Sequence, residues 1–291
     1  MTDLALIAQL IVNGLMAGGT YAILAIGLSL IFGVMNVLNV SYGALYALGG
    51  YFGYTFSVLL GQPPLASLFL AMIASFGIGV LIERFAIERV KGNVNSVILL
   101  TFGLAILIEQ LITLIYSGSY QAVPGIIQGA IVIGVITVNL PRFMAFVVSV
   151  ALSLLLIVFV YRTKIGSAIR VVAFDQELAL LRGISVRRIS MLTLGISSML
   201  AATAAALLAP LLSLYPAVGW NPLLIAFVVV VLGGMGSLGG TVIAGVIYGL
   251  VDVFTGFYLG SEWRQITVLL VIVAVLLLRP QGILGKVVER V

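Results

Sequence analysis

The stretch LALIAQLIVNGLMAGGTYAILAIGLSLIFG, residues 4–33, decides the fold class of this chain. It opens a run of 79 residues, 4–82, without a charged side chain, and residues 189–251 form a second such run of 63. A bilayer core about 30 Å thick takes about 20 helical residues to cross, so each run holds several membrane spans. The strands of outer-membrane barrels alternate apolar and polar side chains, and these runs do not. The sequence therefore predicts an all-α, polytopic transmembrane helical bundle.

The composition of the 291-residue chain points the same way. Hydrophobic residues make up 63 % of the chain. Charged residues make up 8 %, whereas a soluble domain averages about 25 %. A soluble chain this apolar could not cover its own surface with polar groups. A soluble enzyme, a disordered tail and a nucleic-acid-binding domain are therefore excluded as function classes.

Residue types that are missing narrow the chemistry further. The chain has no Cys and no His, which excludes disulfides, thiol chemistry, histidine metal sites and a Ser-His triad. No Lys follows a G-x-x-x-x-G pattern, so the chain has no phosphate-binding loop for a nucleotide. We therefore expect no catalytic residue, no metal and no cofactor in this chain; if ATP drives the protein, a partner subunit binds it. The N-terminus has no basic residues ahead of the apolar run, which predicts a first span and not a cleaved signal peptide.

Turn-forming residues divide the apolar runs into spans within one transmembrane domain, residues 1–291. Residues 126–138 are expected as a short strand pair or an interfacial helix. Residues 223–259 are expected as two helices divided by the segment 233–240, either a re-entrant pair or two short spans, which gives seven or nine crossings. The other expected spans are 5–33, 42–60, 65–82, 97–115, 142–161, 190–212 and 264–278.

Basic residues predict the orientation of these spans. The segments 83–96, 162–189 and 279–291 hold 12 of the 14 Lys and Arg residues. Short loops rich in Lys and Arg face the cytoplasm. We therefore expect the N-terminus outside the cell and the C-terminus in the cytoplasm.

The polar loop at 162–189 is too long for a plain tether between spans. Its apolar residues, Ile169 and Val172 among them, recur at helical spacing between charged ones, which predicts an amphipathic helix. Gly183 is placed to end this helix. Such a helix suits the docking of a soluble partner or rests on lipid headgroups, and the residues alone leave both open.

Four motifs follow one another along the chain. Glu177-Leu178-Ala179-x-x-x-Gly183 has the spacing of the E-A-A-x-x-x-G loop of ABC importer permeases. FGVMNVLNVSYG (32–43) precedes it, and VVLGGMGSLGG (230–240) and RPQGILG (279–285) follow. Together these motifs resemble the branched-chain amino acid ABC transporter permease family, of the LivH type, over essentially the whole chain.

The resemblance implies a permease subunit of an ABC importer, in a bacterial or archaeal cytoplasmic membrane, that moves branched-chain or other hydrophobic amino acids into the cell. It implies a second, related permease, two ATPase subunits, an extracytoplasmic substrate-binding protein and the lipid bilayer as partners, and no nucleic acid. Urea and short-chain amide permeases share the glycine features and remain the alternative. The ATPase-coupling residues that it implies are Arg170, Asp175, Glu177, Ala179 and Gly183.

One segment departs from the family pattern N-F-A-H/Q-G-E. Tyr42 replaces its His or Gln and Ala44 its Glu, which favours an apolar substrate over urea. Polar residues here interrupt an apolar run, and irregular backbone at membrane depth is tolerated where it is buried in protein or lines a wet cavity. Two loops near the membrane surface are the alternative. We therefore expect the substrate pathway at Asn39, Ser41, Tyr42, Gly43, Gly233, Gly234 and Gly236.

Two carboxylates, Glu109 and Asp252, lie inside apolar spans. A carboxylate at a helix centre costs about 2.5–3.5 kcal/mol on insertion scales, so both should face protein or water. They either contact a substrate amino group or join helices, and the second role is favoured. A stand-alone, ion-coupled secondary transporter, the alternative from another class, would need one of them. Glycines spaced four apart, as at Gly14 and Gly18, are expected to let helices approach closely.

Overall fold

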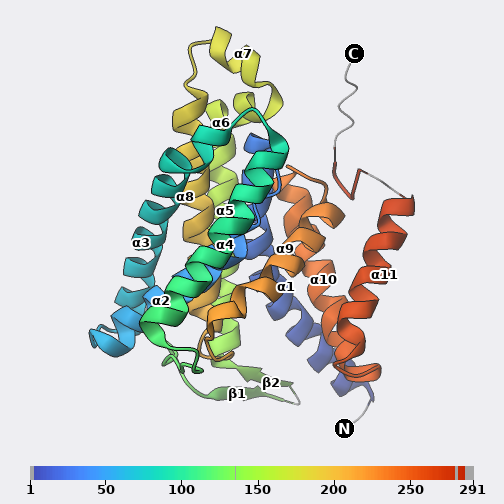
Figure 1. Ribbon diagram of the computed structural model, residues 1–291. Helices are drawn as coiled ribbons and strands as arrows, with labels where there is room; N and C mark the ends of the chain where they lie inside the picture. Colours follow the sequence, from blue (N-terminus) through green and yellow to red (C-terminus); the bar gives the residue numbers. More distant parts are fainter. Residues whose placement is uncertain (1–2, 135, 279–280, 286–291) are drawn as a thin grey trace.

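The computed structural model describes residues 3–134, 136–278 and 281–285. These residues form a bundle of antiparallel helices with a two-stranded hairpin at one end (Figure 1). The all-α prediction is therefore confirmed. The elements are α1 (Asp3–Met35), α2 (Ser41–Tyr54), the π-helix η1 (Thr55–Leu59), α3 (Pro64–Phe85), η2 (Ile87–Val90), α4 (Val94–Tyr116), β1 (Ala130–Ile133), β2 (Ile136–Asn139), α5 (Leu140–Arg162), α6 (Lys164–Phe174), α7 (Gln176–Leu181), α8 (Val186–Leu208), η3 (Pro216–Gly219), α9 (Trp220–Gly233), α10 (Leu238–Tyr258) and α11 (Trp263–Leu278).

The bundle has two distinct ends, which we call the hairpin end and the α7 end (Figure 1). Strands β1 and β2 pair antiparallel with Ala130 opposite Asn139, so the strand-pair expectation for residues 126–138 holds and the interfacial helix does not. The side chain of Gln9 in α1 joins this hairpin. Its amide nitrogen donates to the carbonyl of Thr137 (2.9 Å) and its oxygen accepts from the Thr137 N–H (2.7 Å). Helix α1 therefore starts at the hairpin end.

Within the described part of the chain, seven helices are long and apolar enough to cross a membrane. They begin at Leu4, Pro64, Val94, Leu140, Val186, Pro216 and Leu238. Helix α2, which η1 extends, and α11 are further helices of the bundle (Figure 1). Helix α10 runs antiparallel to α1 along its length, with Gly245 against Ala22 and Gly249 against Gly18. The segment 223–259 thus contains two helices, α9 of 14 residues and α10 of 21, which both contribute to these seven.

The segments with most basic residues gather at the α7 end. The loop between α3 and α4, which contains η2, and the whole of α6 and α7 lie there (Figure 1). Residues 281–285 pack at the same end, because the N–H of Ile283 donates to the carbonyl of Leu232 at the end of α9 (2.9 Å). The remaining residues of the basic tail, 279–280 and 286–291, lie outside the described residues. The arrangement agrees with the segregation of basic loops on which the predicted orientation rests.

Short polar side chains start many of the helices. A side-chain oxygen of the residue before the helix accepts from backbone N–H groups of the first turn, which satisfies donors that have no partner within the helix. The capping residues are Asn93 for α4, Asn139 for α5, Thr163 for α6, Asp175 for α7, Ser185 for α8 and Ser237 for α10.

Helices α1 and α8 form the core of the bundle. The most apolar window of α1 is 78 % buried, whereas that of the peripheral helix α4 is only 22 % buried.

Glycines allow a close helix contact in the core, between α1 and α10. A side chain at Gly249 would meet the main chain of Gly18 and Gly14, and one at Gly18 would meet the main chain of Val246. Small residues spaced four apart let two helix backbones approach in this way. The expectation that Gly14 and Gly18 serve helix packing is confirmed.

Candidate functional site

The predicted coupling loop contains two helices and not one. Helices α6 and α7 are separated at Asp175, whose backbone is extended (φ −159°, ψ 119°). Its carboxylate accepts from the N–H groups of Glu177 (2.8 Å) and Leu178 (3.1 Å), which begins a new helix. The expectation of a single amphipathic helix was therefore wrong, because the capping ability of Asp175 outweighs the helical periodicity around it.

Gly183 ends α7 as predicted. Its φ of +72° lies in the left-handed region that favours glycine. The N–H of Gly183 donates to Leu180 and the N–H of Ile184 to Ala179, both at 2.9 Å, which is the Schellman pattern of a helix end. Gly183 therefore fixes where α7 stops and how the chain turns into α8.

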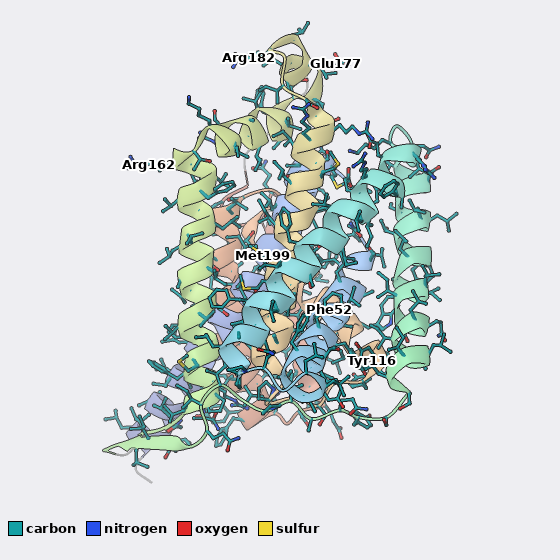
Figure 2. The ribbon with its side chains drawn as sticks, turned by 90° about the vertical axis from the view of Figure 1, so that its left-hand side faces the viewer. Phe52, Tyr116, Arg162, Glu177, Arg182 and Met199 are labelled. Atoms are coloured by element: carbon teal, nitrogen blue, oxygen red, sulfur yellow. The ribbon has the colours of Figure 1, made fainter. Side chains whose placement is uncertain are left out.

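Helix α7 forms the tip of the molecule (Figure 1). Glu177 and Arg182 extend from it away from the bundle (Figure 2). Phe174, Leu180 and Leu181 are exposed there, and Leu181 is 89 % exposed. These side chains form an apolar surface beyond the ends of the spans, which we call the α7 tip.

Two other residues of the predicted coupling set, Ala179 and Arg170, contact the bundle, although the Arg170 side chain is exposed. Ala179 is fully buried beneath α7. The guanidinium of Arg170 lies 5.1 Å from the centre of the Tyr161 ring in α5. The five predicted residues thus share one segment, in which some side chains face outwards and others anchor it to the bundle.

One contact ties α7 to the core, and it was missed from the sequence. The side-chain amide of Gln176 donates to the carbonyl of Val34 at the end of α1 (3.0 Å). Val34 lies 142 residues earlier in the chain, so no local pattern shows this pairing. Helix α7 therefore contacts the segment that leads into the predicted substrate pathway.

The first half of that predicted pathway is fully packed. Asn39 and Ser41 are buried, and the Asn39 carbonyl oxygen accepts from the N–H (3.0 Å) and hydroxyl (2.6 Å) of Ser41. The buried hydroxyl of Tyr42 donates to the carbonyl of Leu24 (2.7 Å). A side chain at Gly43 would meet the carbonyl of Gly219 in η3. These residues fix the start of α2 against α1 and η3.

The second half is packed in the same way at the α7 end. A side chain at Gly233 would meet the main chain of Gly240 and Thr241, and one at Gly234 would meet Gly285. Gly236 lies beside Gly33 of α1. The glycine motif, the end of α1 and residues 281–285 are thereby brought together from three distant parts of the chain.

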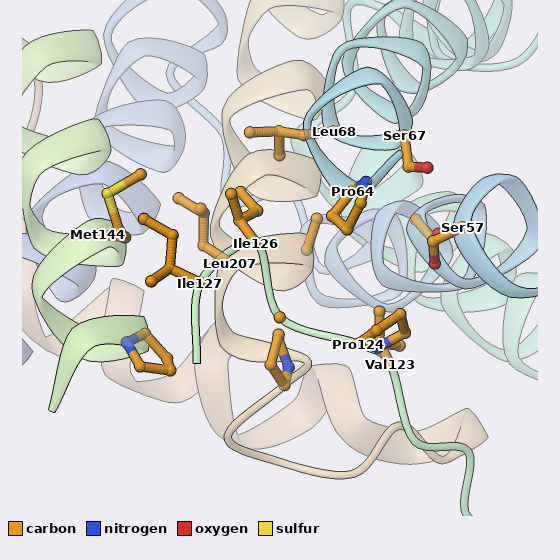
Figure 3. A pocket seen from close by; sticks show the side chains of 15 residues that line it. Ser57, Pro64, Ser67, Leu68, Val123, Pro124, Ile126, Ile127, Met144 and Leu207 are labelled. Atoms are coloured by element: carbon orange, nitrogen blue, oxygen red, sulfur yellow. The ribbon is translucent and has the colours of Figure 1, made fainter. Parts of the chain in front are cut away.

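Two small cavities lie in the bundle, one beside the predicted pathway and one away from it. A cavity of about 10 Å³ lies beside Gly43 and Glu109. Another, of about 30 Å³, lies at the hairpin end with Leu68, Ile126 and Leu207 in its wall (Figure 3). Neither has room for an amino acid. The role of the predicted pathway residues in transport stays a prediction.

The two intramembrane carboxylates each join helices. Glu109 in α4 accepts from the indole N–H of Trp220 in α9 (2.9 Å). Asp252 in α10 accepts from the hydroxyl of Tyr21 in α1 (3.2 Å). Asp252 also lines a cavity of about 390 Å³ at the hairpin end, together with Arg142 and Arg264. The favoured helix-joining role is present at both positions, and at Asp252 it coincides with a cavity.

Residues 10–276 match the family described as the branched-chain amino acid transport system permease component. The chain belongs to this family. It is accordingly a multi-pass membrane protein. Its family consists of permease components of a transport system and is not a family of enzymes. The resemblance seen in the motifs is confirmed.

Individual relatives and one solved structure agree with this assignment. The permease is 30 % identical to the high-affinity branched-chain amino acid transport system permease protein BraD of Pseudomonas aeruginosa, over 96 % of this chain and 95 % of that one. It is 29 % identical to LivH of Escherichia coli K12 over the same shares. It is 28 % identical to a probable LivH of Methanocaldococcus jannaschii, over 90 % of this chain and 88 % of that one. The structure of PsaBC from Streptococcus pneumoniae in complex with Fab shares its fold, with a TM-score of 0.52 at 14 % identity over 92 % of this chain and 91 % of that one.

Proposed function

We propose that this permease is the membrane subunit of an ABC importer that carries branched-chain or other hydrophobic amino acids into the cell. The relatives that cover nearly its full length are named for branched-chain amino acid transport. The observation that carries the mechanism is the α7 tip, an apolar surface held beyond the spans on a capped helix. Such a surface suits docking into the groove of a soluble subunit.

ATPase docking accounts for the α7 tip better than lipid contact does. Phe174, Leu180 and Leu181 lie beyond the ends of the spans, where polar headgroups and water would leave an apolar surface uncovered and a partner subunit would bury it. The chain has no nucleotide-binding loop of its own, so two ATPase subunits supply the energy and no cofactor is bound here. Movement of an ATPase pair reaches α1 through the bond from Gln176 to Val34. A second, related permease and an extracytoplasmic binding protein complete the assembly.

The α7 end faces the cytoplasm in this proposal, in a bacterial or archaeal cytoplasmic membrane. The basic loops gather at that end, and basic loops face the cytoplasm. The hairpin end, where α1 begins, then faces outwards and meets the binding protein. Residues 281–285 lie on the cytoplasmic side.

Transport also requires the packed pathway residues to separate. Gly43 against Gly219 and Gly233 against Gly240 are backbone contacts without interlocking side chains, so they part at low cost. The pair of Gly43 and Gly219 involves α2, and the pair of Gly233 and Gly240 lies next to the end of α1. We therefore place the substrate pathway along Asn39–Gly43 and Gly233–Gly236.

A crosslinking experiment tests the docking surface directly. The chain has no cysteine, so a single one introduced by Leu181→Cys reports one position. We expect a bifunctional thiol–amine reagent to join this residue to the partner ATPase. Leu114→Cys, in the spans and 83 % exposed, is the matched control and should give no product. Crosslinking from Leu114→Cys alone would refute the assignment.

A further inference from the structure

A cavity of about 390 Å³ opens at the hairpin end, away from the predicted pathway residues. Its walls come from α1, α5, α10, the start of α11 and the chain after α8. Small-molecule sites in proteins occupy about 300–1,000 Å³, so this cavity alone, among those next to the carboxylates, has room for a ligand.

A buried carboxylate forms one side of the cavity. Asp252 is 7 % exposed, and its Oδ2 accepts from the Tyr21 hydroxyl at 3.2 Å. The ring of Tyr21 packs edge-on against that of Tyr248, with the ring centres 5.1 Å apart. Because α1 and α10 touch at Gly18 and Gly249, the position of Asp252 is fixed by the core.

Two guanidinium groups line the same cavity. Arg264 at the start of α11 lies directly against Gly256, one turn after Asp252, where any side chain would collide with it. Arg142 comes from the first turn of α5. Among the described residues, the ion pairs join Lys91 to Glu83 and Arg187 to Glu88, so neither arginine is paired with Asp252. The cavity thus presents charges of both signs, with Arg264 within electrostatic range of Asp252 but not in an ion pair with it.

The rest of the wall is mainly apolar. Asn13 and Thr20 of α1 add polar groups, and the other side chains are mostly aliphatic or aromatic. They include Leu10, Met16, Leu208, Leu211, Val253 and Phe257.

We propose that this cavity binds a zwitterionic α-amino acid with an apolar side chain. Asp252 takes the ammonium group, Arg264 and Arg142 take the carboxylate, and the apolar wall takes the side chain. Charged hydrogen bonds of this kind fix both ends of the amino acid. The inference rests on the proposed function, since it assigns that permease an outward-facing site for its substrate class.

Binding of radiolabelled leucine to the purified permease tests the proposal. The full chain is placed in nanodiscs of phosphatidylcholine and phosphatidylglycerol, neither of which has a primary ammonium group that could donate a hydrogen bond to Asp252. We expect saturable binding that Asp252→Asn weakens by about tenfold or more, because a charged partner is lost. Glu262→Gln removes an exposed carboxylate outside the cavity wall and should leave the affinity unchanged.

Leucine analogues assign each charge without relying on one variant. 3-Methylbutylamine lacks the carboxylate of leucine. Arg264→Gln should therefore weaken the binding of leucine and leave the binding of this amine unchanged. 4-Methylpentanoate lacks the ammonium group of leucine. Asp252→Asn should therefore weaken the binding of leucine and not the binding of this acid. Tyr21→Phe, which keeps the ring and removes only the hydroxyl on Asp252, should weaken leucine less than Asp252→Asn does.

Three results would overturn the inference. These are absence of leucine binding to the wild type, equal loss with Glu262→Gln, and displacement of leucine by phosphatidylethanolamine at lipid ratios that mark a lipid site. Leucine uptake by the complete transporter is measured beside them. Uptake that persists in Asp252→Asn with unchanged affinity removes this site and leaves the proposed function standing. An intact wild-type transporter that carries no hydrophobic amino acid refutes the function itself.

Discussion

The amide of Gln176 lies 3.0 Å from the carbonyl of Val34, and this bond joins the α7 tip to the last turn of α1. Helix α1 ends at Met35, and the next residue, Asn36, has a φ of +53° that turns the chain towards Asn39 and α2. Gly236 lies beside Gly33 on the same turn. A displacement of α7 therefore acts on α1, α2 and the α9–α10 turn together.

Removal of this bond should uncouple ATP hydrolysis from transport. Gln176→Ala leaves α7 capped by Asp175, so the ATPase should still bind. One hydrogen bond contributes about 0.5–1.5 kcal/mol, which predicts a loss of uptake per ATP of about two- to tenfold. Uptake and ATP hydrolysis are measured on the same proteoliposomes. Gln128→Ala, an exposed glutamine at the hairpin end, is the control, and an equal ratio in both variants would rule out this route.

The end of α7 should be sensitive to backbone conformation at Gly183. Valine is strongly disfavoured at the observed φ of +72°, whereas asparagine tolerates it. We expect Gly183→Val to reduce co-purification of the ATPase and Gly183→Asn to preserve it, with equal amounts of permease in the membrane. Equal co-purification with both variants would show that the Schellman turn does not position the tip.

The pair formed by Lys91 and Glu83 should respond asymmetrically to mutation. Glu83 is fully buried at the end of α3, while Lys91 is 31 % exposed and lies 2.5 Å away. Lys91→Met leaves a buried carboxylate unpaired and should cost about 3 kcal/mol, the low end for such pairs because the lysine is partly hydrated. Glu83→Gln leaves only a lysine that reaches water and should cost less. Thermal unfolding in detergent gives the order, and the reverse order would contradict this reasoning.

The contact between α1 and α10 should not tolerate a methyl group. Gly249→Ala places Cβ against the main chain of Gly18, and overpacking of this kind costs about 1–3 kcal/mol. Gly77→Ala, in α3 with open space around it, is the matched control and should be neutral or stabilising. A lower unfolding temperature is expected for Gly249→Ala alone. Equal temperatures for the two variants would mean that the helices separate more easily than their contact suggests.

Much of the bundle was predictable because hydrophobic length and charge act locally. Runs without charge predicted the spans. A glycine after a helical stretch predicted the helix end at Gly183, where the structure has a positive φ. The break at Asp175 was missed because the same residue fits a helix by periodicity and a cap by chemistry. Both signals were present, and the capping geometry dominated.

Long-range contacts could not be predicted, because no local pattern encodes them. Gln176 meets Val34 across 142 residues, and Tyr21 meets Asp252 across 231. The apolar spans restrict where a carboxylate is tolerated, so Asp252 stood out in the sequence. Its cavity became visible only once α1, α5 and α11 were placed around it.

The central claim is that this chain transports hydrophobic amino acids only as a subunit driven by a partner ATPase. Uptake of radiolabelled leucine into proteoliposomes tests it, with the permease either alone or together with the proposed second permease, ATPases and binding protein. We predict ATP-dependent uptake by the complete assembly and none by the chain alone under any proton or sodium gradient. Gradient-driven uptake by the chain alone would contradict the claim.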